Sequence, residues 1–177
     1  GGTDNAKFYA GFGYFKQDGI IIYNYSNKYN IRFNSEFTFL NNRVKVGEHI
    51  NLSANKSLGV GNLGEGSPIN SGPYRLQPII PVVWTGSSYV GLSHTFEAGD
   101  WGGTGIAPRL GNSGNTVAGQ TRGKDNSYWD INMIGSAYVD VNILKGLNFR
   151  STFGGTWYNG YDVEYTYATY ESAENTA

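Results

Sequence analysis

The sequence contains no cysteine and a single methionine, and charged residues make up only 15% of its 177 residues. Without cysteine the chain can form neither a disulfide framework nor a thiolate metal site. No apolar run approaches the roughly 18 residues that a transmembrane helix requires. The formal net charge is −1, which gives no reason to expect a nucleic-acid partner, because binding to phosphates requires a basic surface.

Aromatic residues and glycine are abundant instead. Aromatic residues make up 15% of the chain, glycine contributes 26 residues, and apolar residues as a whole reach only 39%. This composition favours strands and turns over helices. The length suits one ordinary domain. Because the chain begins without an initiator methionine or a signal peptide, we expect both of its ends to lie within a longer polypeptide.

Apolar and polar residues alternate over Asn27–Asn55 on both sides of Asn41-Asn42. Since successive side chains of a strand point to opposite faces, the alternation predicts two long strands with one apolar and one polar face. Asparagine tolerates the positive φ of a tight hairpin turn, so the turn is predicted at Asn41-Asn42. The apolar positions are Tyr29, Ile31, Phe33, Phe37, Phe39, Val44, Val46, Ile50, Leu52 and Ala54.

The same alternation recurs elsewhere and predicts an all-β fold of antiparallel up-and-down strands. Short turns at one end of these strands and long connections at the other are typical of transmembrane β-barrels. We therefore interpret residues 1–177 as a partial segment of a transmembrane β-barrel with one long extracellular loop, the remaining barrel being absent. Within that loop, 79–91 predicts a small hairpin. The strands are expected at about 7–16, 27–40, 43–56, 128–143 and 147–160, and the loop at about 57–126.

The polar face of the predicted strands carries more charge than a modest soluble sheet needs, and it suits a hydrated lumen. The strands also exceed the usual five or six residues, and aromatic residues gather near their ends, as at a membrane interface. Glu48 breaks the pattern on the apolar face, and Ile134 and Tyr138 break it on the polar face. The candidate lumen-facing residues are Arg32, Asn34, Glu36, His49, Asp130, Asp140 and Arg150.

Five segments carry a resemblance that spans essentially the whole chain. They are Lys-Tyr-Asn-Ile-Arg-Phe-Asn at 28–34, Val-Lys-Val-Gly at 44–47, Pro-Ile-Ile-Pro-Val at 78–82, Gly-Asn-Ser-Gly-Asn at 111–115, and Ile-Leu-Lys-Gly-Leu-Asn-Phe-Arg at 143–150 with Gly154-Gly155 after it. In their order and spacing the chain resembles the early barrel strands of the SusC/RagA family of TonB-linked outer-membrane nutrient transporters.

The resemblance implies a plugged barrel of about 22 strands in the outer membrane of a bacterial cell, in contact with outer-membrane lipid. It implies a SusD-like surface lipoprotein that closes the barrel from outside, and energy from the TonB complex, which would act through an absent N-terminal part. The implied substrates are oligosaccharides or peptides. The family's amino-terminal extension, TonB-contacting box and plug have no counterpart in this sequence.

Aromatic residues in the long loop are candidates for contact with a substrate or with the lipoprotein lid, because rings stack on sugars and fill interface pockets. A loop mini-core built by the same rings is the alternative. The candidate contact residues are Trp84, Tyr89, Trp101 and Arg109.

Other motifs give weaker signals. Gly59–Gly64 fits G-x-G-x-x-G, but no helix signal follows it. His94, Glu97 and Asp100 have ligand-like chemistry in a loop, where solvated side chains are the simpler interpretation. We expect no catalytic residues, no metal and no cofactor, and hence no enzyme. The alternative function is a secreted carbohydrate-binding β-sandwich, which would be soluble and monomeric, unlike a barrel segment.

Overall fold

The computed structural model describes residues 1–59 and 75–172, so positions 60–64 of the glycine motif lie outside the described residues. The fold is all-β and mainly antiparallel. The chain divides into two compact units. The sheet unit comprises 1–17, 26–57 and 128–162, and the loop unit comprises 18–25, 58–127 and 163–177.

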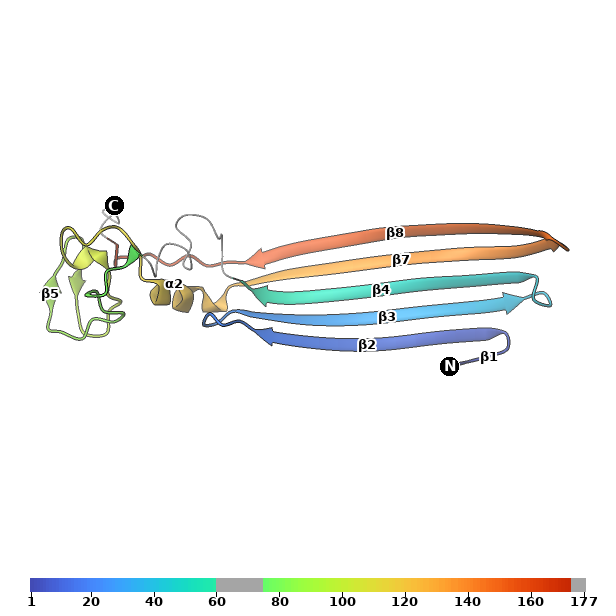
Figure 1. The fold of residues 1–177 in the computed structure, drawn as a ribbon, viewed down its shortest axis with the longest axis horizontal. Helices are drawn as coiled ribbons and strands as arrows, with labels where there is room; N and C mark the ends of the chain where they lie inside the picture. Colours follow the sequence, from blue (N-terminus) through green and yellow to red (C-terminus); the bar gives the residue numbers. More distant parts are fainter. Residues whose placement is uncertain (60–74, 173–177) are drawn as a thin grey trace. The chain divides into compact units, whose positions relative to one another are not determined.

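The sheet unit is one six-stranded sheet in the order β1-β2-β3-β4-β7-β8 (Figure 1). Each strand after β1 lies next to its predecessor in the sheet, as in an up-and-down meander. The longest part of the loop unit, 58–127, is inserted between β4 and β7. The expected strand ranges lie within the observed ones or differ from them at the ends. The strands are β1 (Gly2–Thr3), β2 (Ala6–Asp18), β3 (Tyr25–Phe39), β4 (Val44–Leu58), β7 (Ser127–Leu144) and β8 (Leu147–Val163).

Two tight turns join β3 to β4 and β7 to β8 at the same end of the sheet, which we call the short-turn end (Figure 1). Asn41 and Asn42 have the positive φ values that their side chains tolerate. The first turn is wider than predicted, because Leu40 also has a positive φ and the Arg43 amide donates to the Leu40 carbonyl. Gly146 supplies the positive φ of the second turn.

The register between β4 and β7 fixes the two faces of the sheet. Val46 pairs with Val139 and Leu52 with Met133 on one face. Lys45 pairs with Asp140 on the other. The face that carries the valines is called the apolar face below, and the opposite one the polar face.

The apolar face is exposed. Phe33, Val139 and Phe149 keep 40, 39 and 55% of their surface accessible. The three buried hydrophobic residues among the described residues all lie in the loop unit, at Ile80, Phe96 and Ala118.

The loop unit contains short elements around Phe96, which is fully buried. The hairpin predicted at 79–91 is wrong, because β5 pairs instead with β6 further along the chain and Val83 forms a bridge with Trp101. The helix α2 was not predicted. The elements are β5 (Tyr89–Val90), β6 (Thr95–Phe96), η1 (Thr104–Ile106), α2 (Thr116–Arg122) and η2 (Gly123–Asp125).

Among the described residues, none of the helices has the length and apolar character needed to cross a membrane.

Candidate functional site

A network of polar side chains crosses the polar face near the short-turn end. The Tyr138 hydroxyl on β7 donates to Glu36 on β3 at 2.7 Å. The Arg150 guanidinium on β8 lies over the Tyr138 ring, 4.4 Å from its centroid, and 4.0 Å from the Asp140 carboxylate. Lys7 on β2 approaches the Glu36 carboxylate at 3.8 Å. Four strands therefore contribute directly to one cross-strand network.

Gly47 makes this network possible. Strand β4 lies between β3 and β7, and Gly47 pairs with Tyr138 in the register. A Cβ added at Gly47 would lie 2.5 Å from the Tyr138 ring, closer than real Cβ contacts occur. The ring therefore crosses β4 over the bare backbone of Gly47, and this path takes the Tyr138 hydroxyl to Glu36.

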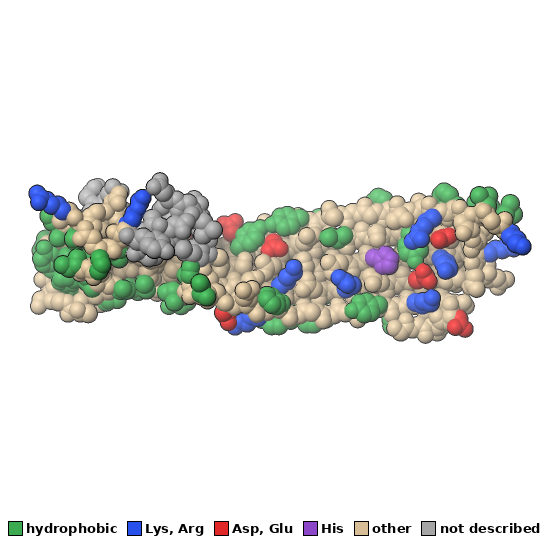
Figure 2. Space-filling view, in the orientation of Figure 1, with side chains coloured by type: hydrophobic (Ala, Val, Ile, Leu, Met, Phe, Trp, Pro, Cys, Tyr) green, Lys and Arg blue, Asp and Glu red, His purple; other side chains and the backbone are tan. Residues whose placement is uncertain are grey.

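Charge is concentrated in the same region. Figure 2 shows Lys and Arg, Asp and Glu, and histidine side chains gathered toward the short-turn end of the sheet. His49 stacks on the Tyr138 ring at a centroid distance of 6.0 Å. The polar face thus offers a mixed-charge surface with hydrogen-bonding groups and an aromatic ring.

A second polar group lies on the same face, near the end of the strands opposite the short turns, which we call the loop end. The Ser26 hydroxyl donates to the Asn55 side-chain oxygen Oδ1 at 3.0 Å, and the Asn55 side-chain nitrogen Nδ2 donates to the Asp130 carboxylate at 3.0 Å. Arg32 and Asn34 lie along β3 between these two groups. Among the described residues, the Arg32 side chain has no hydrogen bond or ion pair.

The seven residues predicted to line a lumen lie on this one face. Lys7 and Gly47 were not predicted as site residues, and Tyr138 was identified from the sequence only as an exception to the alternation. The signal for Tyr138 was its position, since a tyrosine on a polar face directly opposite a glycine indicates a ring that lies across the neighbouring strand.

Glu48, the exception on the apolar face, lies opposite Ala137. Its carboxylate accepts a hydrogen bond from Ser35, which is 4% exposed. The two polar groups therefore satisfy each other within an apolar surface.

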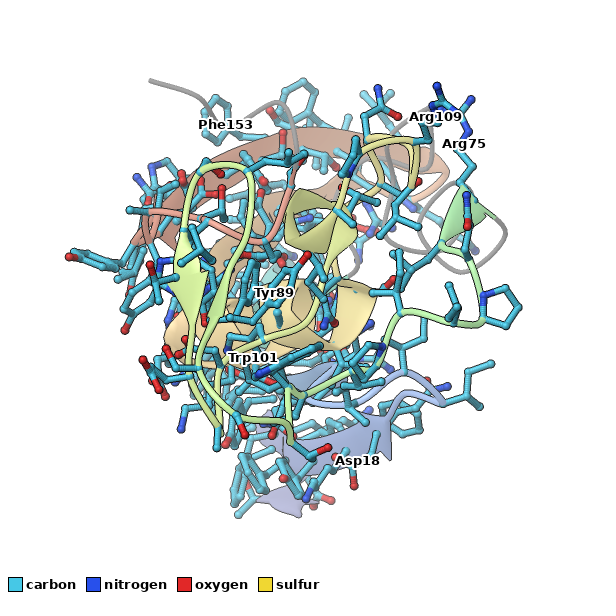
Figure 3. The ribbon with its side chains drawn as sticks, turned by 90° about the vertical axis from the view of Figure 1, so that its left-hand side faces the viewer. Asp18, Arg75, Tyr89, Trp101, Arg109 and Phe153 are labelled. Atoms are coloured by element: carbon cyan, nitrogen blue, oxygen red, sulfur yellow. The ribbon has the colours of Figure 1, made fainter. Side chains whose placement is uncertain are left out.

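The predicted contact residues of the loop unit are only partly brought together. Trp84 lies 5.8 Å from Tyr89 and 6.4 Å from buried Phe96 between ring centroids. Tyr89 is 42% exposed. Arg109 is exposed and drawn well apart from Tyr89 and Trp101 in Figure 3. The rings around Phe96 form a mini-core, and Tyr89 is its exposed rim.

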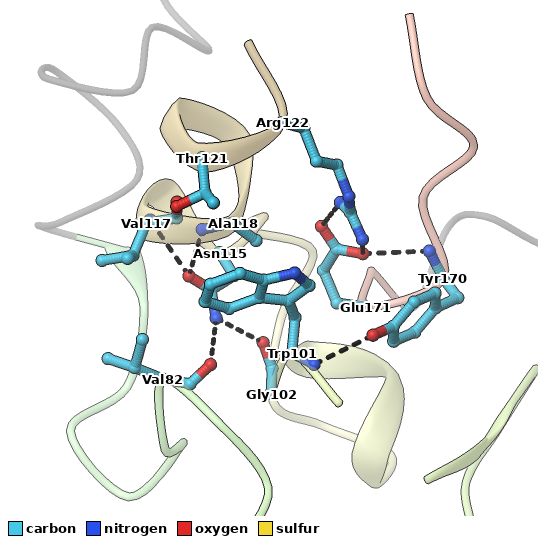
Figure 4. Close-up of polar contacts among 10 residues, drawn as sticks. All are labelled: Val82, Trp101, Gly102, Asn115, Val117, Ala118, Thr121, Arg122, Tyr170 and Glu171. Atoms are coloured by element: carbon cyan, nitrogen blue, oxygen red, sulfur yellow. Dashed lines mark hydrogen bonds and ion pairs between the residues drawn. The ribbon is translucent and has the colours of Figure 1, made fainter. Parts of the chain in front are cut away.

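Asn115 organises the loop unit (Figure 4). Its side-chain oxygen accepts hydrogen bonds from the Val117 and Ala118 amides, which caps the N-terminus of α2. Its amide nitrogen donates to the carbonyls of Val82 at 2.7 Å and Gly102 at 2.9 Å. One buried side chain thus joins the helix to two loop segments.

The segment after β8 is bound to the same core (Figure 4). The Arg122 guanidinium donates to Glu171, whose side chain is 4% exposed, with one of the two bonds at 3.1 Å. Burial acts to raise the pKa of the Glu171 carboxyl, but the hydrogen bonds from Arg122 and from backbone amides outweigh it and lower the pKa. The Tyr170 hydroxyl accepts a hydrogen bond from the Trp101 amide at 2.9 Å.

His94, Glu97 and Asp100 do not converge. The His94 Nε2 atom lies 3.0 Å from Asp100, whereas the Glu97 carboxylate accepts a hydrogen bond from Ser88. The backbone amide of Glu97 and then His94 lower the pKa of the Asp100 carboxyl. Within 1–59 and 75–172, no group of three or more His, Cys, Asp or Glu side chains is arranged to hold a metal ion.

A comparison of the sequence with models of protein families found no match, and a comparison with curated proteins found none either.

Proposed function

We propose that this chain is part of a TonB-dependent outer-membrane transporter of the SusC/RagA type, which imports oligosaccharides or peptides together with a SusD-like lipoprotein. In this role the apolar face meets outer-membrane lipid and the polar face meets the hydrated interior of a barrel. The chain binds and conducts its substrate and catalyses no reaction.

The observation that carries the proposal is the exposed apolar face of a single-layer sheet. A soluble sandwich buries such a face against a second sheet about 10 Å away. In this sheet Phe33 and Phe149 stay 40 and 55% exposed, and Phe153 reaches 81%. Large apolar patches of this kind mark surfaces that meet a partner or a membrane. The secreted β-sandwich is less well supported for this reason.

The aromatic residues of the apolar face also support a membrane. Near the loop end Tyr14 lies 5.0 Å from Tyr29, and Trp129 stacks on Tyr161 at 6.1 Å. The ammonium of Lys56 lies 5.0 Å from the centre of the Trp129 ring. Tyrosine, tryptophan and a long cationic side chain are the groups that settle at the lipid headgroup level.

The spacing between the aromatic groups fits a bilayer. On β3, Tyr29 lies near the loop end and Phe39 at the short-turn end. Ten residue steps of about 3.3 Å give about 33 Å along the strand, and a tilt of about 40° projects this length onto about 25 Å. Outer-membrane barrels have an apolar band of about 25 Å.

The open edges of the sheet support a larger barrel. Strand β8 has β7 as its single neighbour in the sheet, and every residue of β8 is exposed. In lipid each unpaired backbone group costs several kcal/mol, so such an edge requires a further strand. The proposed barrel supplies that strand from another part of the polypeptide.

Two neighbouring residues of β3 test the proposal. In the complete natural protein, Phe33→Arg places a charge on the lipid face and should impair membrane assembly, because an arginine near the bilayer midplane costs about 2–4 kcal/mol. Asn34→Arg places the same charge on the polar face and should be tolerated. Assembly is measured as the amount of folded protein in purified outer membranes. Equal amounts of the two variants would contradict the proposal.

A further inference from the structure

A depression on the polar face contains polar groups that the network around Tyr138 does not use. It lies over β2, β3 and β4 and has a volume of about 250 Å³. Gly11 and Gly13 of β2 form part of its wall. The residues around it include Tyr9, Gly11, Gly13, Asn30, Arg32 and Asn51.

The glycines shape the depression in different ways. A Cβ at Gly11 would lie 2.7 Å from the Tyr9 hydroxyl, so the phenol ring lies along the strand over Gly11. A Cβ at Gly13 would meet only the Asn30 Cβ at 3.9 Å, an ordinary contact. Gly11 therefore allows the Tyr9 ring its position, whereas Gly13 leaves open space.

Arg32 gives the depression its charge. No acidic residue lines it. Two acidic groups elsewhere on the polar face have other partners, since Glu36 is bonded to Tyr138 and Asp130 to Asn55. An exposed guanidinium without a counterion presents two parallel N–H donors that match a carboxylate.

The other lining groups suit a sugar ring. Asn30 and Asn51 each carry a donor and an acceptor, which match the hydroxyl groups of a saccharide. Tyr9 is 54% exposed and offers an apolar ring beside them. A sugar residue that carries both hydroxyl groups and a carboxylate on its ring offers a partner to each of these groups and to Arg32.

We propose that this depression binds a uronic acid residue of an acidic oligosaccharide, with the carboxylate on Arg32, the hydroxyl groups on Asn30 and Asn51, and the ring beside Tyr9. The inference rests on the proposed function and narrows its substrate class from oligosaccharides or peptides to saccharides that carry carboxylates.

Calorimetric titration of the complete natural protein in detergent micelles tests the proposal. The probes are the trimer of galacturonic acid and its carboxyl-reduced counterpart, which keeps the linkages and loses the charge. The acidic trimer should bind at least tenfold more tightly than the neutral one. Arg32→Gln should remove this difference, and Gly13→Val should weaken both probes by filling the space.

Arg43→Gln is the matched control, because it removes the same charge from the turn just before β4, outside the depression, and it should bind as the unmodified protein does. Equal affinity for the two trimers, no binding of either, an unchanged preference in Arg32→Gln, or binding of a short acidic peptide in place of the trimer would each overturn the proposal. Circular dichroism establishes that the variants fold.

The experiments distinguish a failure of the uronate site from a failure of the proposed transport function. The comparison of Phe33→Arg with Asn34→Arg measures membrane assembly without any saccharide. If these variants differ and the titrations fail, the transporter proposal stands and the uronate site does not.

Discussion

Gly47 is the single residue on which the polar network depends most directly, because the Tyr138 ring occupies the space of its missing side chain. Gly47→Ala should therefore force the ring away from Glu36. We expect a loss of about 1–3 kcal/mol in the free energy of unfolding, the usual cost of overpacking. The measurement is the urea unfolding midpoint of the complete protein in micelles.

Gly155→Ala is a suitable control for Gly47→Ala. It makes the same chemical change on β8, where a Cβ meets nothing within 4 Å. Its effect should be neutral or slightly stabilising, since alanine loses less backbone entropy on folding than glycine. If both alanine variants unfold at the same urea concentration, Tyr138 does not depend on Gly47.

The carboxyl groups of Asp100 and Glu171 make the loop unit sensitive to acid. Both have a lowered pKa in the folded protein. A lowered carboxyl pKa contributes stability that is present above the pKa of the unfolded chain, about 4, and is lost as the pH falls through the folded value. Thermal unfolding of the loop unit, followed by near-ultraviolet circular dichroism, should shift to lower temperature between pH 6 and pH 3.

Asp100→Asn and Glu171→Gln should each reduce this pH dependence, because each removes one of the two titrating groups. The Glu171 variant should also unfold at lower temperature at pH 6, since it leaves the largely buried Arg122 without its charged partner. If the variant that carries both substitutions keeps the pH dependence of the unmodified protein, other groups cause that dependence.

At the scale of the elements, the helix α2 depends on Asn115. Asn115→Ala removes an N-cap, worth about 1 kcal/mol. It also leaves the Gly102 carbonyl without that donor, at about 1–3 kcal/mol, whereas the Val82 carbonyl keeps its hydrogen bond from the Gly102 amide. The amides of α2 should then lose protection in hydrogen-exchange measurements, together with the neighbouring loop segments.

Asn115→Asp separates the two roles of Asn115. The aspartate keeps an acceptor for the Val117 and Ala118 amides but cannot donate to the two carbonyls. Its helix should therefore stay protected while the contacts to Val82 and Gly102 weaken. Loss of protection confined to α2 in both variants would show that the amide nitrogen contributes little.

Strands could be predicted from the sequence and the loop elements could not. Alternation over β3, β4 and β7, broken at few positions such as Glu48, determines both strand and face, so the polar positions such as Glu36 and Asp140 could be assigned to one face. The loop unit has no such period, and its hairpin at Tyr89–Phe96 depends on burying Phe96 among distant residues. The signals for α2 were present, with Asn115 at its start and Gly123 after its end, but seven residues are too few for a helical period.

The contacts of the polar network could likewise be predicted only in part from the sequence. Alternation predicts that Glu36 and Tyr138 share a face only if the strands are paired in the right register. Register between β4 and β7 joins residues about ninety positions apart, and no local pattern contains it. The contact through Gly47 therefore required the structure.

At the scale of the whole molecule, the chain expressed alone should aggregate without detergent. Its sheet exposes an apolar face and the unpaired edge of β8, both of which favour association between copies. Detergent should keep a fraction dispersed by covering the apolar face. Size-exclusion chromatography and light scattering provide the measurement, and a soluble monomer with a cooperative thermal transition would contradict the expectation.

The pairing of Ser57 with Tyr128 brings the two ends of the insertion together as neighbours in one ladder. A flexible insertion would add a loop-closure entropy cost to the pairing of β4 with β7. This cost grows only slowly with the number of residues in the insertion. The sheet can therefore accept insertions of very different lengths at this junction, which makes it a natural place for evolution to exchange one inserted module for another while the strands keep their register.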